Sequence, residues 1–120
     1  PMSSPLLLKK IIKKYSKAIF LLGHSGGANK GRQEALELAL ANPNVRLEFC
    51  GSFCSNIPWD QTIKQVGTKR IVFGSDSFLH DISWELGRLL STPVPDKELI
   101  PILGLNMEKI LTRIKLKRKG

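Results

Sequence analysis

Polar residues that can bind a metal or transfer a proton follow three short apolar runs of the sequence. His24 follows the run at residues 18–23, Asp76 follows the run at residues 70–75, and Ser52 follows a third run between them. Imidazole and carboxylate groups are ligands for divalent metals and proton-transfer groups near neutral pH. The three residues follow one another at separations of 28 and 24 residues, intervals that one strand and one helix fill. The pattern predicts three strand ends that together form a metal or proton-transfer site.

Each of these residues also has a purely structural interpretation. His24 could hydrogen-bond a loop carbonyl, Asp76 could cap a helix or form a turn, and Ser52 could be a turn residue. Gly26 permits close approach of the backbone to a substrate, but a Gly-Gly pair is weak evidence for a phosphate site. His80 follows the last run and could reach the mouth of the site, although we expect an exposed loop histidine.

The apolar runs alternate with helical patterns, which predicts an α/β fold. We expect strands at about 18–23, 45–50 and 70–73, and helices at about 4–17, 31–41, 58–67, 82–90, 97–105 and from 106 onward. The strand runs are short and continuous, as in strands buried on both faces of a parallel sheet. Asp96 and Asn106 are expected as helix N-caps, and Pro101 as the site of a kink or late start.

Length and composition limit the chain to one domain or part of one. Its 120 residues, 42% of them hydrophobic, can bury one core, in which we expect Trp59 and Trp84. No apolar run approaches the roughly 20 residues that cross a bilayer, and no secretory signal pattern begins the sequence, so we expect a cytoplasmic protein without a membrane partner. Cys50 and Cys54 are expected to be reduced thiols, because a zinc site at Cys-x3-Cys needs two further close ligands, for which His24 and His80 are the only obvious candidates.

The net charge of +9 raises the question of a nucleic-acid partner, because lysine and arginine neutralise phosphates. The lysines at 9–17 alternate with apolar residues at helical spacing, which predicts the solvated face of an amphipathic helix. A second basic cluster at 115–119 is a C-terminal tail. Neither cluster carries a series of aromatic residues on which bases could stack, which argues against nucleic acid. A non-catalytic basic α/β domain that binds nucleic acid or another anionic partner is the alternative function.

Five segments resemble, in order, the closing third of the amidohydrolase-related family, which comprises metal-dependent (β/α)8 barrel hydrolases and decarboxylases. The segments are His-Ser-Gly-Gly at 24–27, the helix at 34–39, Asn-Pro-Asn-Val leading to Cys-Gly-Ser at 42–52, Gly-Thr-Lys-Arg-Ile-Val-Phe-Gly-Ser-Asp at 67–76, and Asn-Met-Glu-Lys-Ile-Leu at 106–111. The resemblance covers about residues 3–111. Five signatures at matching intervals are specific, whereas each alone would be weak.

The resemblance implies that residues 1–120 are a single partial domain, the C-terminal part of a (β/α)8 TIM barrel, with strands six to eight and their helices. The active site of such a barrel lies at the carboxyl ends of its strands. By the family pattern, Asp76 ligates a divalent metal, expected to be zinc, and takes a proton from its bound water. His24 is a metal ligand or a base beside the metal. Ser52 and Gly26 are the candidates for substrate contact.

The implied function is metal-dependent hydrolysis of an amide, ester or lactone-type bond in a small molecule, or decarboxylation of an aromatic-type acid. The family's His-x-His and strand-five histidine are absent from these 120 residues, so we expect this chain alone to bind metal weakly and to be inactive. The open sheet edge predicts pairing into a homo-oligomer. A doubly wound nucleotide-binding domain is a weaker alternative, because residues 24–27 lack the Gly-x-Gly-x-x-Gly spacing.

Overall fold

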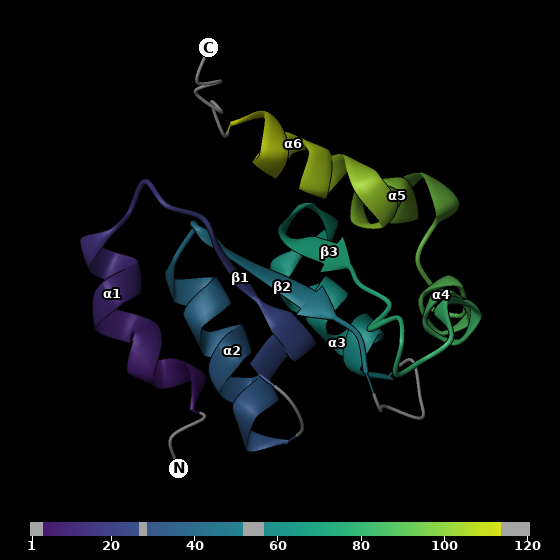
Figure 1. Ribbon diagram of the computed structural model, residues 1–120, viewed down its shortest axis with the longest axis horizontal. Helices are drawn as coiled ribbons and strands as arrows, with labels where there is room; N and C mark the ends of the chain where they lie inside the picture. Colours follow the sequence, from purple (N-terminus) through teal and green to yellow (C-terminus); the bar gives the residue numbers. More distant parts are fainter. Residues whose placement is uncertain (1–3, 27–28, 52–56, 114–120) are drawn as a thin grey trace.

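Three parallel strands form the centre of the fold (Figure 1), and they lie in the order β1 (Phe20–Leu22), β2 (Val45–Phe49) and β3 (Ile71–Phe73). Leu47 pairs with Leu22 on one side and with Ile71 on the other, which sets the register. The computed structural model describes residues 4–26, 29–51 and 57–113. The predicted α/β class with a parallel sheet is confirmed.

Helices lie at the predicted places; α2, α3 and α4 match the predicted bounds to within one residue, whereas α1 is shorter than predicted. They are α1 (Lys9–Lys14), α2 (Lys30–Ala41), α3 (Ile57–Val66), α4 (Ile82–Leu90), α5 (Asp96–Ile100) and α6 (Asn106–Thr112). Shorter helical turns are η1 (Pro5–Leu8), η2 (Gly23–Gly26), η3 (Thr68–Arg70) and η4 (Pro101–Leu105). None of the described helices has the length and apolar character needed to cross a membrane.

The hydrophobic core lies between the sheet and the helices that cover it. Alternate residues of β2, namely Val45, Leu47 and Phe49, are buried. Trp59 of α3 is fully buried against Phe49, with ring centroids 4.6 Å apart, as predicted for a core residue. Trp84 is half exposed, so the core prediction was wrong there.

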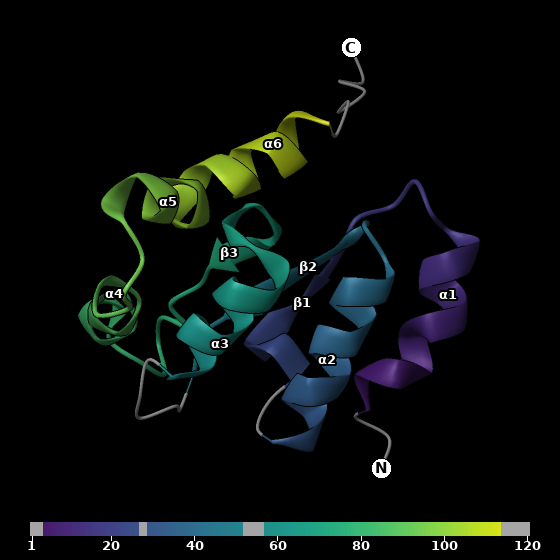
Figure 2. The same ribbon diagram turned by 180° about the vertical axis from the view of Figure 1, so that it is seen from behind.

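The prediction that the strands are buried on both faces is wrong for β2. Arg46 and Glu48 alternate with its buried residues and are only partly covered, and Leu21 of β1 is exposed. The reason is visible in the two views, where α2 and α3 lie behind the sheet in Figure 1 and in front of it in Figure 2, both on one face. Arg46 and Glu48 therefore lie on the other face, one near each end of the strand.

The last three helical elements, α5, η4 and α6, form one continuous helical run beside β3 (Figure 1). Asp96 is the first residue of α5 and makes no cap bond, because the residue before it occupies the N-cap position. Asn106 is likewise no cap: it has helical backbone angles, and its buried side chain donates to the carbonyl oxygens of Thr68 and Ile71, each at 2.7 Å. Pro101 begins a wider π-helical turn, through which the run continues.

Candidate metal centre at the carboxyl ends of the strands

His24 lies in the tight turn η2, which directly follows β1. Its φ of 54° is in the left-handed region, which residues other than glycine seldom adopt. Its backbone N–H donates to Glu48 Oε2 at 2.9 Å, and the neighbouring Ser25 donates from its hydroxyl to the Glu48 carbonyl oxygen at 2.8 Å. The turn is therefore tied to β2, and strained backbone held in this way is common at functional sites.

Asp76 follows β3 and faces one nitrogen of the His24 ring. Its Oδ2 lies 3.5 Å from His24 Nε2, so the structure brings together these two residues, which the sequence singled out. The same oxygen lies 3.9 Å from His80 Nε2. His80 lies in the loop before α4, as predicted, but its side chain is partly buried rather than exposed. The chain folds back after Asp76, whose carbonyl oxygen accepts hydrogen bonds from the backbone N–H groups of Leu79 and His80.

Glu48, which the sequence analysis missed, and Cys50, which it set aside as a metal ligand, lie beside the other ring nitrogen. Cys50 Sγ is 3.1 Å from His24 Nδ1 and 3.2 Å from Glu48 Oε2. One ligand atom from each of His24, Glu48 and Cys50 lies within 4.8 Å of the others. The signal that could have indicated Glu48 is the alternation in β2, where charged side chains occupy every second position.

The Glu48 carboxylate has one oxygen, Oε1, that is buried without a hydrogen-bond partner. The carboxylate lies against Gly74, where a Cβ would come within 1.9 Å of Oε1, so only glycine leaves room for it. A buried carboxylate oxygen without a partner costs free energy unless a cation or donor satisfies it. The carboxylate and imidazole groups at this end of the sheet therefore fit a divalent metal.

The Cys50 thiol is a weak candidate for a nucleophile. Its burial, the hydrogen bond to Glu48 and the charges of Glu48 and Asp76 raise its pKa to about 12, against a smaller opposing effect of the His24 backbone. The group is therefore a protonated thiol at neutral pH and donates its hydrogen to Glu48. Cys50 is free, as predicted, and Cys54 lies outside the described residues.

A buried ion pair in α4 supports the segment beside His24. Arg88 Nη1 donates to Glu85 Oε2 at 2.6 Å and to the Gly51 carbonyl oxygen at 3.4 Å. Burial raises the pKa of the Glu85 carboxyl, and the charge of Arg88 opposes that shift. Gly51 has a φ of 96°, and a Cβ there would lie 3.3 Å from the His24 ring. The ion pair thus anchors a glycine that the His24 ring requires.

Of the two residues predicted to contact substrate, the structure describes only Gly26. Gly26 is the last residue of η2, so its backbone belongs to the same turn as His24. Ser52 lies outside the described residues.

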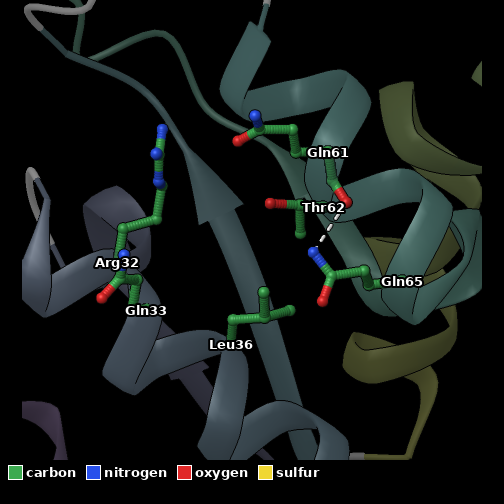
Figure 3. A pocket seen from close by; sticks show the side chains of 6 residues that line it. All are labelled: Arg32, Gln33, Leu36, Gln61, Thr62 and Gln65. Atoms are coloured by element: carbon green, nitrogen blue, oxygen red, sulfur yellow. Dashed lines mark hydrogen bonds between the residues drawn. The ribbon is translucent and has the colours of Figure 1, made fainter.

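A separate hollow of about 350 Å³ lies between α2 and α3 (Figure 3). It is lined by Arg32, Gln33, Leu36, Gln61, Thr62 and Gln65. Figure 3 shows Gln65 turned toward the Gln61 backbone, to whose carbonyl oxygen it donates at 3.3 Å. None of the described residues that line it is a histidine, a cysteine or a carboxylate, which are the ligand types found at the strand ends.

The fold is similar to part of several solved decarboxylase structures. The 5-carboxyvanillate decarboxylase from Sphingomonas paucimobilis shares 16% identity at a TM-score of 0.67, over 89% of this chain and 37% of that structure. A dihydroxybenzoic acid decarboxylase from Polaromonas sp., with bound manganese and the inhibitor 2-nitroresorcinol, shares 16% sequence identity at a TM-score of 0.64. The match covers 85% of this chain and 36% of that structure. The 2,6-dihydroxybenzoate decarboxylase from Rhizobium shares 14% sequence identity at a TM-score of 0.66, over 86% of this chain and 37% of that structure.

These similarities confirm the predicted fold class, a mixed α/β unit that corresponds to part of a (β/α)8 barrel. The chain spans little more than a third of the length of those structures. No curated protein matches the sequence. The model of the amidohydrolase family matches residues 1–113, which is nearly the whole chain. The predicted resemblance is therefore confirmed, and the chain belongs to the amidohydrolase family.

Proposed function

We propose that this chain, as a single partial domain over residues 1–120, supplies part of a metal-dependent active site at the carboxyl ends of its strands. His24 and Asp76 are the proposed metal ligands, with Glu48 as a further oxygen donor. The observation that carries the proposal is the meeting of these side chains around one imidazole, beside a buried carboxylate oxygen that has no partner. Zinc is the expected ion, and manganese, present in the Polaromonas decarboxylase, is its competitor.

Each group at this site has a proposed chemical role. A divalent ion at this site would supply Lewis acidity, which polarises a bound oxygen and lowers the pKa of bound water. His24 is either a metal ligand or the base beside the metal; as the base, its Nε2, 3.5 Å from Asp76 Oδ2, would exchange a proton with that carboxylate or with a substrate. Cys50, as a neutral thiol, orients Glu48. Gly26 and Ser52 are proposed to contact the substrate.

Two reactions suit this set of groups. Decarboxylation of an aromatic acid is favoured by the names of the three structural neighbours. Hydrolysis of an amide, ester or lactone-type bond in a small molecule is the second candidate, in keeping with the family's name. The cytoplasmic location and the homo-oligomer remain predictions.

Metal binding by the full chain tests the ligand assignment without any measurement of activity. Titration calorimetry with Zn²⁺ and with Mn²⁺ should show weak binding, because the family's other histidine ligands are absent from the sequence. Asp76→Asn should weaken it at least tenfold, while Lys10→Gln on exposed α1 should not change it. Tight, stoichiometric binding of zinc would contradict the prediction that the ligand set is incomplete. An unchanged metal affinity in Asp76→Asn would contradict the assignment of Asp76 as a ligand.

A chimera tests the reaction. Residues 1–113 would replace the matching segment of the Rhizobium 2,6-dihydroxybenzoate decarboxylase, with folding checked by circular dichroism. We expect metal-dependent release of carbon dioxide from 2,6-dihydroxybenzoate, lowered by a factor of roughly 10² to 10⁴ in His24→Ala, since that is what loss of a proton-transfer group costs. Lys10→Gln is the matched control. A folded, metal-loaded chimera with neither decarboxylase nor hydrolase activity would contradict the proposed function.

A further inference from the structure

Five cationic side chains gather at the opposite end of the sheet, where the strands begin. They come from three segments that are distant in the sequence: the start of β2, the turn η3 before β3, and the end of α6. These residues are Arg46, Lys69, Arg70, Lys109 and Arg113. Four of them, all but Arg70, surround a hollow of about 80 Å³, together with Ile19, Asn106 and Ile110.

Within the described part of the chain, none of the five cations forms an ion pair with a carboxylate. Arg46 uses one guanidinium nitrogen to donate to the carbonyl oxygens of Pro43 and Val45, at 2.7 and 3.0 Å. The Nε of Arg70 is buried without a hydrogen-bond partner. These cations therefore retain donors and positive charge for a ligand.

The cations lie close enough to repel one another. Burial lowers the pKa of Arg46, and the charges of Arg70 and Arg113 lower it further. The fold holds the group together in spite of this cost, because Asn106 ties α6 to the start of β3 through the carbonyl oxygens of Thr68 and Ile71. Like charges held together by a rigid frame attract an anion.

This cluster is distinct from the candidate metal centre. Arg46 and Cys50 are four residues apart on one extended segment, so their backbones lie about 13 Å from each other at the usual rise of a strand. The cations face the beginning of the strands, whereas the metal centre lies beyond their carboxyl ends.

We propose that this hollow binds one compact oxyanion of the phosphate type, with Arg46 and Arg113 as the principal donors and the two lysines as supporting charges. Arginine presents a planar fork of donors that matches the oxygens of a phosphate group, and lysine acts as a point charge. The small volume suits a single phosphate group of a small molecule. Nucleic acid is a poorer fit, because none of the described lining residues has an aromatic side chain on which a base could stack.

Inorganic phosphate is the probe that tests this site in the full chain. The unfolding midpoint should rise with phosphate at constant ionic strength and should not rise with chloride, because a ligand that binds only the native state stabilises it. NMR titration of the arginine Nε–Hε resonances gives the affinity independently of stability. Arg113→Gln, at the exposed end of α6, should weaken phosphate binding at least tenfold, whereas Lys10→Gln should not.

The same measurements can overturn the proposal. Equal effects of phosphate and chloride, or equal affinities in Arg113→Gln and Lys10→Gln, would contradict a built oxyanion site. Binding of duplex DNA without any response to phosphate would contradict a small ligand. Asp76→Asn should leave phosphate affinity unchanged, so a failure at this site can be told apart from a failure of the proposed metal centre.

Discussion

The two ends of the sheet differ in the charge that they collect. At the carboxyl ends lie two carboxylates, two histidines and a neutral thiol, whereas the described charged residues around the hollow at the beginnings of the strands are arginines and lysines. Arg46 and Glu48 occupy the same face of β2, separated by one residue. One short strand therefore contributes a side chain to each of the two proposed sites, the metal site at one end and the anion site at the other.

The two ends also differ in how they handle buried charge. Near the carboxyl end, Glu85 and Arg88 form an ion pair with almost no exposure to solvent. At the amino end, the described cations have no carboxylate partner and repel one another. Near the carboxyl end the buried charge has an internal partner, whereas at the amino end the proposed partner is an external anion.

The largest expected effect comes from breaking the internal ion pair. Glu85→Ala removes the carboxylate from Arg88 in a buried environment and should lower the free energy of unfolding by about 3–5 kcal/mol, as measured by urea denaturation. Asp60→Ala breaks the exposed pair with Lys64 and should cost less than about 1 kcal/mol. Equal losses in both variants would show that the buried pair has no special role.

A smaller loss is expected at Gly51. Gly51→Ala places a side chain at a φ of 96° and 3.3 Å from the His24 ring, which should cost about 1–3 kcal/mol of stability and weaken metal binding. Gly87→Ala is the matched control, since a Cβ at that position in α4 meets no atom within 4 Å. Phosphate affinity should be the same in both variants. A parallel loss of phosphate affinity in Gly51→Ala would contradict the independence of the two ends.

The Cys50 thiol predicts a pH dependence in the metal-free chain. Its pKa is about 12 in the folded state against an ordinary 9.0, so its contribution to stability is fully present below about pH 9 and is lost as the pH rises toward 12. The slope is at most about 1.4 kcal/mol per pH unit for one group. A Cys54→Ser chain should show this loss, and the same chain with Cys50→Ala should show less of it. Rapid alkylation of Cys50 by iodoacetamide at pH 8 would contradict the raised pKa.

The smallest expected change in stability comes from removing one cation at the amino end of the sheet in the absence of phosphate. Arg113→Gln removes one of the repelling charges and should raise the free energy of unfolding by roughly 0.2–1 kcal/mol at low salt, the range of exposed charge interactions. The gain should shrink at about 1 M salt, where charges are screened within roughly 3 Å. Lys10→Gln, outside the cluster, should change stability less. A loss of stability in Arg113→Gln at every salt concentration would show that repulsion is not the dominant effect there.

Much of the fold was predictable because its signals are local. Apolar runs and helical periodicity predicted all three strands and the helices around them, and the common position of His24 and Asp76 at strand ends predicted that they would meet. The predictions of N-caps at Asp96 and Asn106 were wrong, since an N-cap depends on the residue at which the helix begins, which packing against neighbouring elements decides. Asn106 instead serves a tertiary contact between α6 and β3.

The sequence by itself determined the family, the α/β order of elements and the pair His24 and Asp76, because each is written in a local pattern or an interval along the chain. Only the tertiary structure decided that Glu48, Cys50 and His80 join that pair, and that cations from three distant segments converge at the other end. Strand register, the covering of one sheet face and the turn after Asp76 arise from packing between distant segments, and no local pattern encodes such packing.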